Sequence, residues 1–247
     1  MIKSLLLDLD DTLLGNSVQN FMNGYFSLLS DYARPHFDEA TFLPSLIQAT
    51  QVMVQNTDPA LTNDQVFWRA FEGMTGGKRD ELEPFFTHFY EDDFLRLQAQ
   101  TEMRPAAAQL VNMAMERGLS VVVATNPLFP QRAIEHRLEW AGLPVSQYDF
   151  ALVTTYENMH AAKPQPAYYR EILATVGVRP EQALMVGDDW KNDIAPAAAA
   201  GLHTYWIAAE DVAPPDPSIL HGQGTLDALA ERVANGWLEQ LGASAAL

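Results

Sequence analysis

The chain has 247 residues and a formal net charge of −17 at pH 7, and it contains no cysteine. The length allows a large core, either as one domain or as a domain with a sizeable insertion. The negative charge argues against nucleic acid or an anionic membrane as the main partner, and the absence of cysteine excludes disulfides, zinc–thiolate sites and cysteine nucleophiles. The apolar run before Asp8 is too short for a signal peptide or a membrane span, so we expect a soluble, cytoplasmic protein.

The first predicted element is a short strand that ends in carboxylates. Residues 5–14 read Leu-Leu-Leu-Asp-Leu-Asp-Asp-Thr-Leu-Leu, an apolar run followed by Asp8, Asp10 and Asp11. An unpaired carboxylate at the end of a buried strand is costly unless a metal or hydrogen bonds take it up. Asp8 and Asp10 are two residues apart, so in extended backbone their side chains point to the same side and can share one site.

Residues 16–101 have helical periodicity and no convincing β-branched run. Apolar side chains recur at helical spacing in three segments, 21–29, 67–71 and 85–89. This pattern predicts an all-helical cap domain over 16–101, inserted into an α/β core made of 1–15 and 102–247. The glycine-rich segment 73–78 lacks the spacing of a phosphate loop and is interpreted as a flexible loop of the cap.

From Arg104 onward, helical and strand-like segments alternate. Prolines open several of the predicted helices and glycines follow them, as is usual at helix ends. The predicted helices are 105–117, 130–141, 166–176, 194–200 and 226–241, and the predicted strands are 119–124, 150–154, 183–186 and 203–207. The alternation predicts an α/β fold, a Rossmann-like doubly wound parallel sheet.

Polar side chains follow the predicted strands, at the edge where ligands bind in open parallel sheets. They are Asp8, Asp10 and Thr12 after the first strand, Thr125 and Asn126 after the second, Lys163 beyond the third, and Asp188, Asp189 and Asp193 beyond the fourth. Hard cations prefer carboxylate oxygens, and phosphate oxygens prefer lysine, hydroxyl and amide donors. The set therefore indicates magnesium-assisted phosphoryl chemistry.

Four segments in this order resemble the motifs of the haloacid dehalogenase-like (HAD) hydrolase superfamily. They are Asp8-Leu9-Asp10-Asp11-Thr12, Thr125-Asn126, Lys163-Pro164 and Gly187-Asp188-Asp189-Trp190-Lys191-Asn192-Asp193. The helical insertion after the first strand is similar to that of the phosphatase-type subgroup with a cap at this place. The short span between Thr125 and Lys163 leaves no room for a cap at the alternative position.

The resemblance implies a Mg²⁺-dependent phosphatase that acts on a small phosphorylated metabolite. Asp8 would be the nucleophile that forms an aspartyl-phosphate, and Asp10 would be the general acid and base. The implied magnesium ligands are the carboxylates of Asp8 and Asp188 and the backbone carbonyl of Asp10. The implied phosphate-binding residues are Thr125, Asn126 and Lys163. Asp193 would support the site through Lys163 or through a metal-bound water.

Three alternatives stay open at this point. A phosphomutase or phosphotransferase would share every motif residue, and a non-catalytic regulator could bind a phosphorylated ligand on the same fold. A haloacid dehalogenase is disfavoured because a halide leaving group needs no acid such as Asp10. Asp189 either adds charge to the metal site or caps the next helix, and we favour the cap.

The substrate contacts of the cap are the least readable part of the sequence. Candidates are Asn16, Asn20, Arg34, Arg69, Lys78 and Arg79. The six histidines have no ligand spacing, so a transition-metal site is not expected. The sequence does not predict the oligomeric state.

Overall fold

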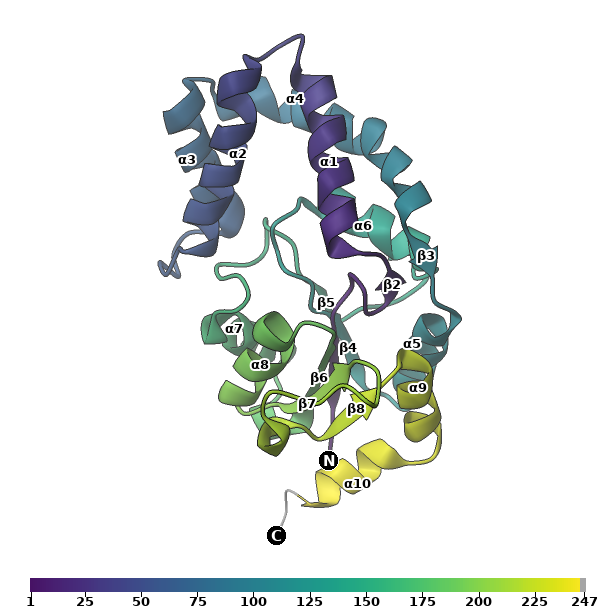
Figure 1. Cartoon of the computed structure of the whole chain (residues 1–247). Coiled ribbons are helices and arrows are strands. Elements are labelled where there is room, and N and C mark those ends of the chain that lie inside the picture. The colour runs from purple at the N-terminus through teal and green to yellow at the C-terminus, as the bar shows by residue number, and fades with distance from the viewer. Residues whose placement is uncertain (245–247) are drawn as a thin grey trace.

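The computed structural model describes residues 1–244 and shows a parallel sheet flanked by helices, with a separate block of helices above it (Figure 1). The sheet has six strands in the order β5-β4-β1-β6-β7-β8. Their bounds are Ser4–Leu7 (β1), Ser120–Val123 (β4), Leu152–Val153 (β5), Ala183–Gly187 (β6), His203–Ile207 (β7) and Gly222–Gly224 (β8). Every neighbouring pair is parallel, which confirms the predicted α/β core.

β1 lies in the middle of the sheet and is buried on both faces. Leu5 and Leu7 point to one face, where they share a core with α5 (Pro105–Glu116) and α9 (Leu226–Ala234). Leu6 points to the other face and packs in the core that includes α7 (Pro166–Val176). This alternation follows from the twofold repeat of a strand, and it explains the unbroken apolar run in the sequence.

Most of the predicted core elements are present within one or two residues. The α-helices of the sheet domain that are not yet named are α6 (Gln131–Trp140), α8 (Ala195–Ala199) and α10 (Trp237–Ser244). The single terminal helix predicted over 226–241 is wrong, because α9 and α10 are separate. Gly236 between them adopts a left-handed backbone with φ 82°, which a continuous helix does not allow. The prediction also missed β8, whose sequence Gly-Gln-Gly has no strand signal.

Residues 18–100 form helices joined by short loops, as their periodicity predicts. They are α1 (Val18–Ala33), α2 (Glu39–Val54), α3 (Asn63–Thr75), α4 (Arg79–Glu91) and a 3-10 helix, Asp93–Gln100. The glycine-rich segment is shorter as a loop than predicted, because α3 runs to Thr75. Gly76 then ends the helix in a left-handed conformation with φ 73°.

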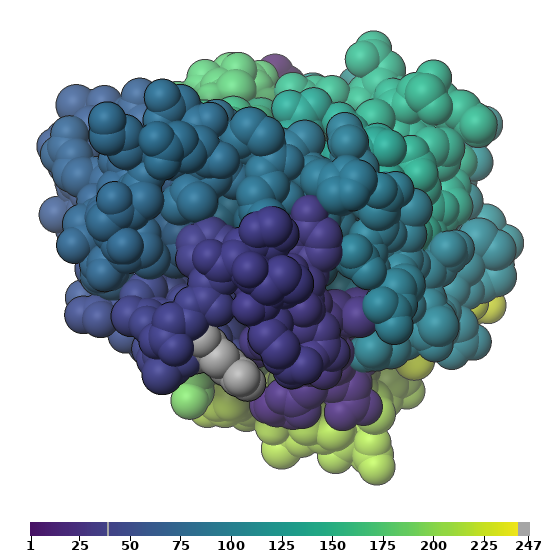
Figure 2. Space-filling view, turned by 90° about the horizontal axis from the view of Figure 1, so that it is seen from above, coloured from purple at the N-terminus to yellow at the C-terminus, as the bar shows by residue number. Residues whose placement is uncertain are grey.

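Two short strands join the helical block to the sheet domain. β2 (Leu14–Gly15) pairs antiparallel with β3 (Glu102–Met103), so the two chain crossings lie side by side. Each strand has only two residues, too few to show a period in the sequence. Seen from above, the helical block lies across the sheet domain, and later parts of the chain remain visible at the rim (Figure 2).

The helical block also touches the sheet domain at the start of α3. The amides of Asn63 and Asp64 donate to the carbonyls of Met159 and Tyr156, at 2.7 and 2.9 Å. The side chain of Asn63 is fully buried and donates to the carbonyl of Ala161 at 3.2 Å. Within residues 1–244, no helix is both long and apolar enough to cross a membrane.

Candidate active site

The carboxyl ends of the central strands open into one pocket of about 570 Å³. It is lined by all six residues that the sequence singles out for catalysis, phosphate binding or metal binding, and by Asp193, for which the sequence predicts a supporting role. The six are Asp8, Asp10, Thr125, Asn126, Lys163 and Asp188. Six aspartates line this pocket against one lysine and one arginine. The excess of negative charge has to be offset before an anionic ligand can bind.

Lys163 lies at the floor of the pocket between two carboxylates. Its ammonium is 2.6 Å from Asp8 Oδ1 and 2.5 Å from Asp193 Oδ1. Lys163 is 2% exposed, so desolvation opposes its charge, but Asp193 and Asp8 raise its pKa well above the ordinary value. The lysine is therefore a fixed positive charge beside Asp8.

Burial raises the pKa values of the carboxyls around this lysine. The pKa of Asp8 rises to about 8, because burial and the charges of Asp193 and Asp10 outweigh the lowering effect of Lys163. Burial, with the charges of Asp8 and Asp11, raises the pKa of Asp188 to about 7. Burial likewise raises the pKa of Asp193 to about 6. Without a cation, these carboxyls keep their protons to a higher pH than ordinary aspartates do.

Three of these aspartates are close enough to hold one metal ion. Asp8, Asp188 and Asp193 each offer a carboxylate oxygen, and these oxygens lie within 4.8 Å of one another. An all-oxygen donor set of this kind fits a hard divalent cation. The side chain of Asp10 is outside this cluster because it is bound elsewhere.

Asp10 is held by two side chains, one of which the sequence did not indicate. Arg137 Nη1 donates to Asp10 Oδ2 at 2.5 Å, and Asn16 Nδ2 donates to Asp10 Oδ1 at 3.1 Å. Arg137 is 2% exposed, its guanidinium lies 4.7 Å from the centre of the Phe129 ring, and its Nη2 has no hydrogen-bond partner among residues 1–244. Because both oxygens of Asp10 are engaged, its carboxylate has a defined orientation in the pocket.

Arg137 was missed because it belongs to a helix and not to a strand end. A signal for it is present, since Arg137 interrupts an apolar stripe on α6 formed by Ala133, Ile134, Leu138 and Ala141. An arginine in a buried stripe requires a partner, and the carboxylates of the site supply it.

A second arginine holds the loop that carries Asp10. Arg104 donates to Asp11 Oδ1 at 2.5 Å, to the Asp11 carbonyl, and to the Thr12 carbonyl at 3.0 Å. Asp11 has a positive φ of 53°, uncommon for a residue other than glycine, and these contacts hold it there. Arg104 follows β3 directly, so the second chain crossing is bound to the loop after β1.

Hydrogen bonds from buried side chains hold the backbone that follows β4. The carbonyl of Thr125 accepts hydrogen bonds from Thr154 Oγ1 and the Tyr168 hydroxyl, at 2.7 and 2.8 Å. Asn126 Oδ1 accepts from the backbone amide of Lys163 at 3.2 Å. These bonds join the loops after β4 and β5 and bring Thr125, Asn126 and Lys163 together in the pocket.

The turn after β6 places Asp188 and Asp193 and is shaped by Gly187. A Cβ atom on Gly187 would lie 2.2 Å from Asp193 Oδ2, so only glycine allows this approach. Thr12 Oγ1 donates to Asp188 Oδ1 at 3.3 Å, which links the turn to the loop after β1. Asp189 accepts from the amides of Lys191 and Asn192, so it caps the following turn as expected.

Of the six candidates for substrate contacts from the cap, only Asn16 lines this pocket within the described residues 1–244. Arg79 forms ion pairs with Asp64 and Glu83 at 2.9 Å each, and Arg34 pairs with Asp31 on the surface. Asn20, Arg69 and Lys78 are exposed and do not line the pocket. The contribution of α1 is instead Ser17 just before it, and Val18, Phe21 and Met22 within it.

Comparison with known proteins agrees with the four motifs. A family model described as haloacid dehalogenase-like hydrolase matches residues 2–201. A phosphoserine phosphatase of Thermus thermophilus is 29% identical over 87% of this chain and 92% of its own length. A phosphoglycolate phosphatase of Rhodospirillum rubrum is 30% identical over 86% of this chain and 84% of its own.

Solved structures show the same fold. A 2-haloacid dehalogenase of Pseudomonas syringae superposes with a TM-score of 0.62 at 24% identity, over 96% of this chain and all of that one. The CbbY protein of Rhodobacter sphaeroides, solved with phosphate, gives 0.55 at 21% identity, over 93% of this chain and 96% of that one. The family resemblance read from the sequence is thereby confirmed, and the chain belongs to the haloacid dehalogenase-like hydrolases and is an enzyme of that family.

Proposed function

We propose that this enzyme is a Mg²⁺-dependent phosphatase that hydrolyses a small phosphorylated metabolite through an aspartyl-phosphate on Asp8. The observation that carries the proposal is the presence of two differently held carboxylates in one pocket. Asp8 contacts the ammonium of Lys163 at the floor, whereas Asp10 is bound by Arg137 and Asn16. Two carboxyl groups in different surroundings can act as nucleophile and as acid and base.

In the first step a carboxylate oxygen of Asp8 attacks phosphorus, and the bond from phosphorus to the ester oxygen breaks. Asp10 gives its proton to the departing alkoxide, which leaves as the alcohol. In the second step Asp10 takes a proton from a water molecule whose oxygen attacks the phosphorus. The bond between phosphorus and the Asp8 oxygen breaks, which regenerates the Asp8 carboxylate and forms inorganic phosphate. Lys163 offsets the negative charge of Asp8 and of the phosphoryl group, and Thr125 and Asn126 bind phosphoryl oxygens.

The donor set of the pocket supports the choice of cofactor. We propose that the carboxylates of Asp8 and Asp188 and the backbone carbonyl of Asp10 hold Mg²⁺. Asp193 keeps Lys163 in place through its 2.5 Å contact. When bound, the ion supplies the positive charge that allows a phosphate ester to approach the pocket's aspartates.

We also propose that residues 16–101 act as a cap on the catalytic core formed by 1–15 and 102–247. In support, Val18, Phe21 and Met22 of α1 line the same pocket as the catalytic carboxylates. A helix in this place excludes water from the reacting phosphate and contacts the alcohol part of the substrate. We also propose that the enzyme is located in the cytoplasm, a reducing compartment that a chain without cysteine allows.

The test is phosphate release from an aryl phosphate in the presence of Mg²⁺. Asp8→Asn is expected to lower turnover about a thousandfold or more, because the amide cannot accept the phosphoryl group. Asp10→Asn is expected to keep ligand binding and lose turnover. Asp227→Asn, on the exposed face of α9, is the matched control and should leave the rate unchanged. Full activity of Asp8→Asn would exclude it as the nucleophile.

A further inference from the structure

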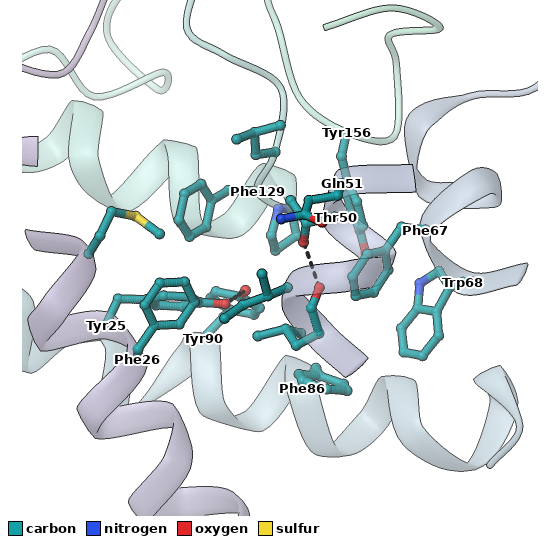
Figure 3. Close-up of a pocket in the computed structure, with 15 residues that line it drawn as sticks. Tyr25, Phe26, Thr50, Gln51, Phe67, Trp68, Phe86, Tyr90, Phe129 and Tyr156 are labelled. Atoms are coloured by element: carbon teal, nitrogen blue, oxygen red, sulfur yellow. Dashed lines mark hydrogen bonds between the residues drawn. The ribbon is translucent and has the colours of Figure 1, made fainter. Parts of the chain in front are cut away.

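A second cavity, of about 180 Å³, lies between the helical block and the sheet domain. Its walls come from α1, α2, α3 and α4, from the segment that follows Asn126, and from Tyr156 (Figure 3). The lining side chains are Met22, Tyr25, Phe26, Leu46, Ile47, Thr50, Gln51, Phe67, Trp68, Phe86, Tyr90, Leu128, Phe129, Pro130 and Tyr156. None of them carries a charge, and more than half are aromatic.

Some polar atoms of the cavity wall are paired within the protein, whereas Trp68 Nε1 is buried and has no hydrogen-bond partner among residues 1–244. The hydroxyls of Tyr25 and Tyr90 bond to each other at 2.9 Å, and Thr50 Oγ1 donates to the carbonyl of Leu46 at 2.9 Å (Figure 3). Gln51 is exposed and lies at the rim with Ile47, which is 39% exposed. The lining therefore consists mainly of rings and methyl groups, with the Trp68 N–H as an unpaired donor, and its rim opens to solvent.

This cavity adjoins the catalytic pocket. Met22, Leu128 and Phe129 line both spaces. The ring of Phe129 lies 4.7 Å from the guanidinium of Arg137 and 5.1 Å from the ring of Tyr25. Phe129 is thus the boundary, with Arg137 and the carboxylates beyond one side and the aromatic cavity beyond the other.

We propose that the cavity holds the alcohol part of the substrate, so that the enzyme prefers phosphate monoesters of alcohols that carry an aromatic ring or an apolar group of similar size. The inference rests on the proposed phosphatase function and names the class of its substrate. A buried apolar cavity of about 150 Å³ is large enough to bind benzene, so the space here suits a single ring.

The charge of the walls favours the same class. A carboxylate or ammonium on the alcohol part would lose its hydration in the cavity, with no oppositely charged side chain among the fifteen that line it. An apolar ring has no such hydration to lose, and it gains contact with the aromatic walls. Small charged esters would leave the cavity unfilled.

The test compares 2-phenylethyl phosphate with ethyl phosphate, with Mg²⁺ present. Both release a primary alkoxide, so their intrinsic reactivities are similar and the ratio of kcat/KM values reports binding of the ring. Burial of a ring of this size predicts a ratio of about tenfold or more in favour of the phenylethyl ester. O-phosphoserine serves as the small charged comparison and should be a poor substrate.

Variants of α2 locate the effect. Thr50→Phe places a ring inside the cavity and should lower the phenylethyl-to-ethyl ratio about fivefold or more. Val52→Phe is the matched control, since Val52 is 41% exposed on the same helix and does not line the cavity, and it should keep the wild-type ratio. Gln51→Trp, at the exposed rim, repeats the test without adding bulk to a buried position.

The outcomes separate the inference from the function on which it rests. Equal kcat/KM values for the two esters, or an unchanged ratio in both Thr50→Phe and Gln51→Trp, would overturn the inference and leave the phosphatase function intact. If no ester is hydrolysed, the proposed function fails. Calorimetry with 2-phenylethylphosphonate and ethylphosphonate then still decides the inference, since a ring-binding cavity predicts tighter binding of the first.

Discussion

A single guanidinium joins the acid–base candidate to the aromatic wall of the site. Arg137 reaches Asp10 at 2.5 Å, and it packs against Phe129 on the way. Because Arg137 is 2% exposed, removal of Asp10 would leave a buried positive charge without its ion-pair partner. We therefore expect Arg137 to be a positioning residue, which acts on the proposed reaction through the orientation of Asp10.

Replacement of Arg137 by Met keeps much of the side-chain volume and removes the charge. We expect kcat to fall about 10- to 100-fold with little change in KM, because in the proposed mechanism Asp10 acts in the chemical step. Arg137→Lys should recover part of the rate. Arg132→Met is the control, on the same helix but at its surface beside Glu135. A raised KM with unchanged kcat would instead assign Arg137 to substrate binding.

At the scale of elements, the first turn of α3 fastens the helical block to the sheet domain. Its amides at Asn63 and Asp64 donate to carbonyls of the segment after β5, and the buried Asn63 side chain adds a bond to Ala161. Amides in the first turn of a helix have no hydrogen-bond partner within the helix. This contact therefore gives a partner both to the amides of α3 and to the carbonyls of the segment after β5. The contact is one of several between the two parts, since Gln165 Nε2 also donates to the carbonyl of Val54 at 2.6 Å.

Asn63→Ala is expected to weaken this contact while the helix itself remains. The loss of one buried hydrogen bond should lower the free energy of local opening by about 1 kcal/mol. Hydrogen exchange of the Asp64 amide should then be about fivefold faster. Mass spectrometry of exchanged peptides measures it. Asn23→Ala, on the exposed side of α1, should leave exchange at Asp64 unchanged. Equal exchange in wild type and Asn63→Ala would show that the block is held elsewhere.

At the scale of the whole molecule, the negative charge is concentrated where the substrate has to bind. The chain carries a formal net charge of −17, and six aspartates line one pocket. Burial raises the pKa values of Asp8, Asp188 and Asp193 to about 8, 7 and 6. Protons and a divalent cation therefore compete for the same oxygens.

If Mg²⁺ is the cofactor, as proposed, this competition predicts that its effect on stability depends on pH. Without metal, the folded chain keeps protons that the unfolded chain has lost. The stabilisation from these protons is complete below about pH 4 and is lost as pH rises through about 6 to 8. At high pH these carboxyls are deprotonated, so their oxygens can bind the ion. At a Mg²⁺ concentration about 100 times Kd, binding raises the free energy of unfolding by about 2.7 kcal/mol. This corresponds to an increase in Tm of about 5–10 °C.

We therefore expect the Mg²⁺-induced rise in Tm to be larger at about pH 8.5 than at about pH 6. Differential scanning calorimetry with and without MgCl₂ measures it, with NaCl of equal ionic strength as the control. Asp188→Asn should remove most of the rise at the higher pH. A rise of equal size at both pH values would contradict the raised pKa values of the carboxyls.

Sequence reasoning located those parts of the site that follow strands directly. Asp8, Thr125 and Asp188 each come one or two residues after a buried run, so the strand places them without further information. Arg137 was not found, because its role depends on how α6 packs across the sheet edge. β8 was not found either, because its Gly-Gln-Gly sequence is a strand only through its pairing with β7.

The pairing of β2 with β3 has a consequence for protein engineering. The helical block leaves the sheet domain and returns to it on neighbouring antiparallel strands, whose backbones lie about 5 Å apart. The two splice points are thus adjacent in space, and a foreign domain whose termini lie equally close can replace residues 16–101 without stretching the sheet. Arg104, just beyond the second splice point, stays with the sheet domain and continues to hold the Asp11 loop in such a chimera.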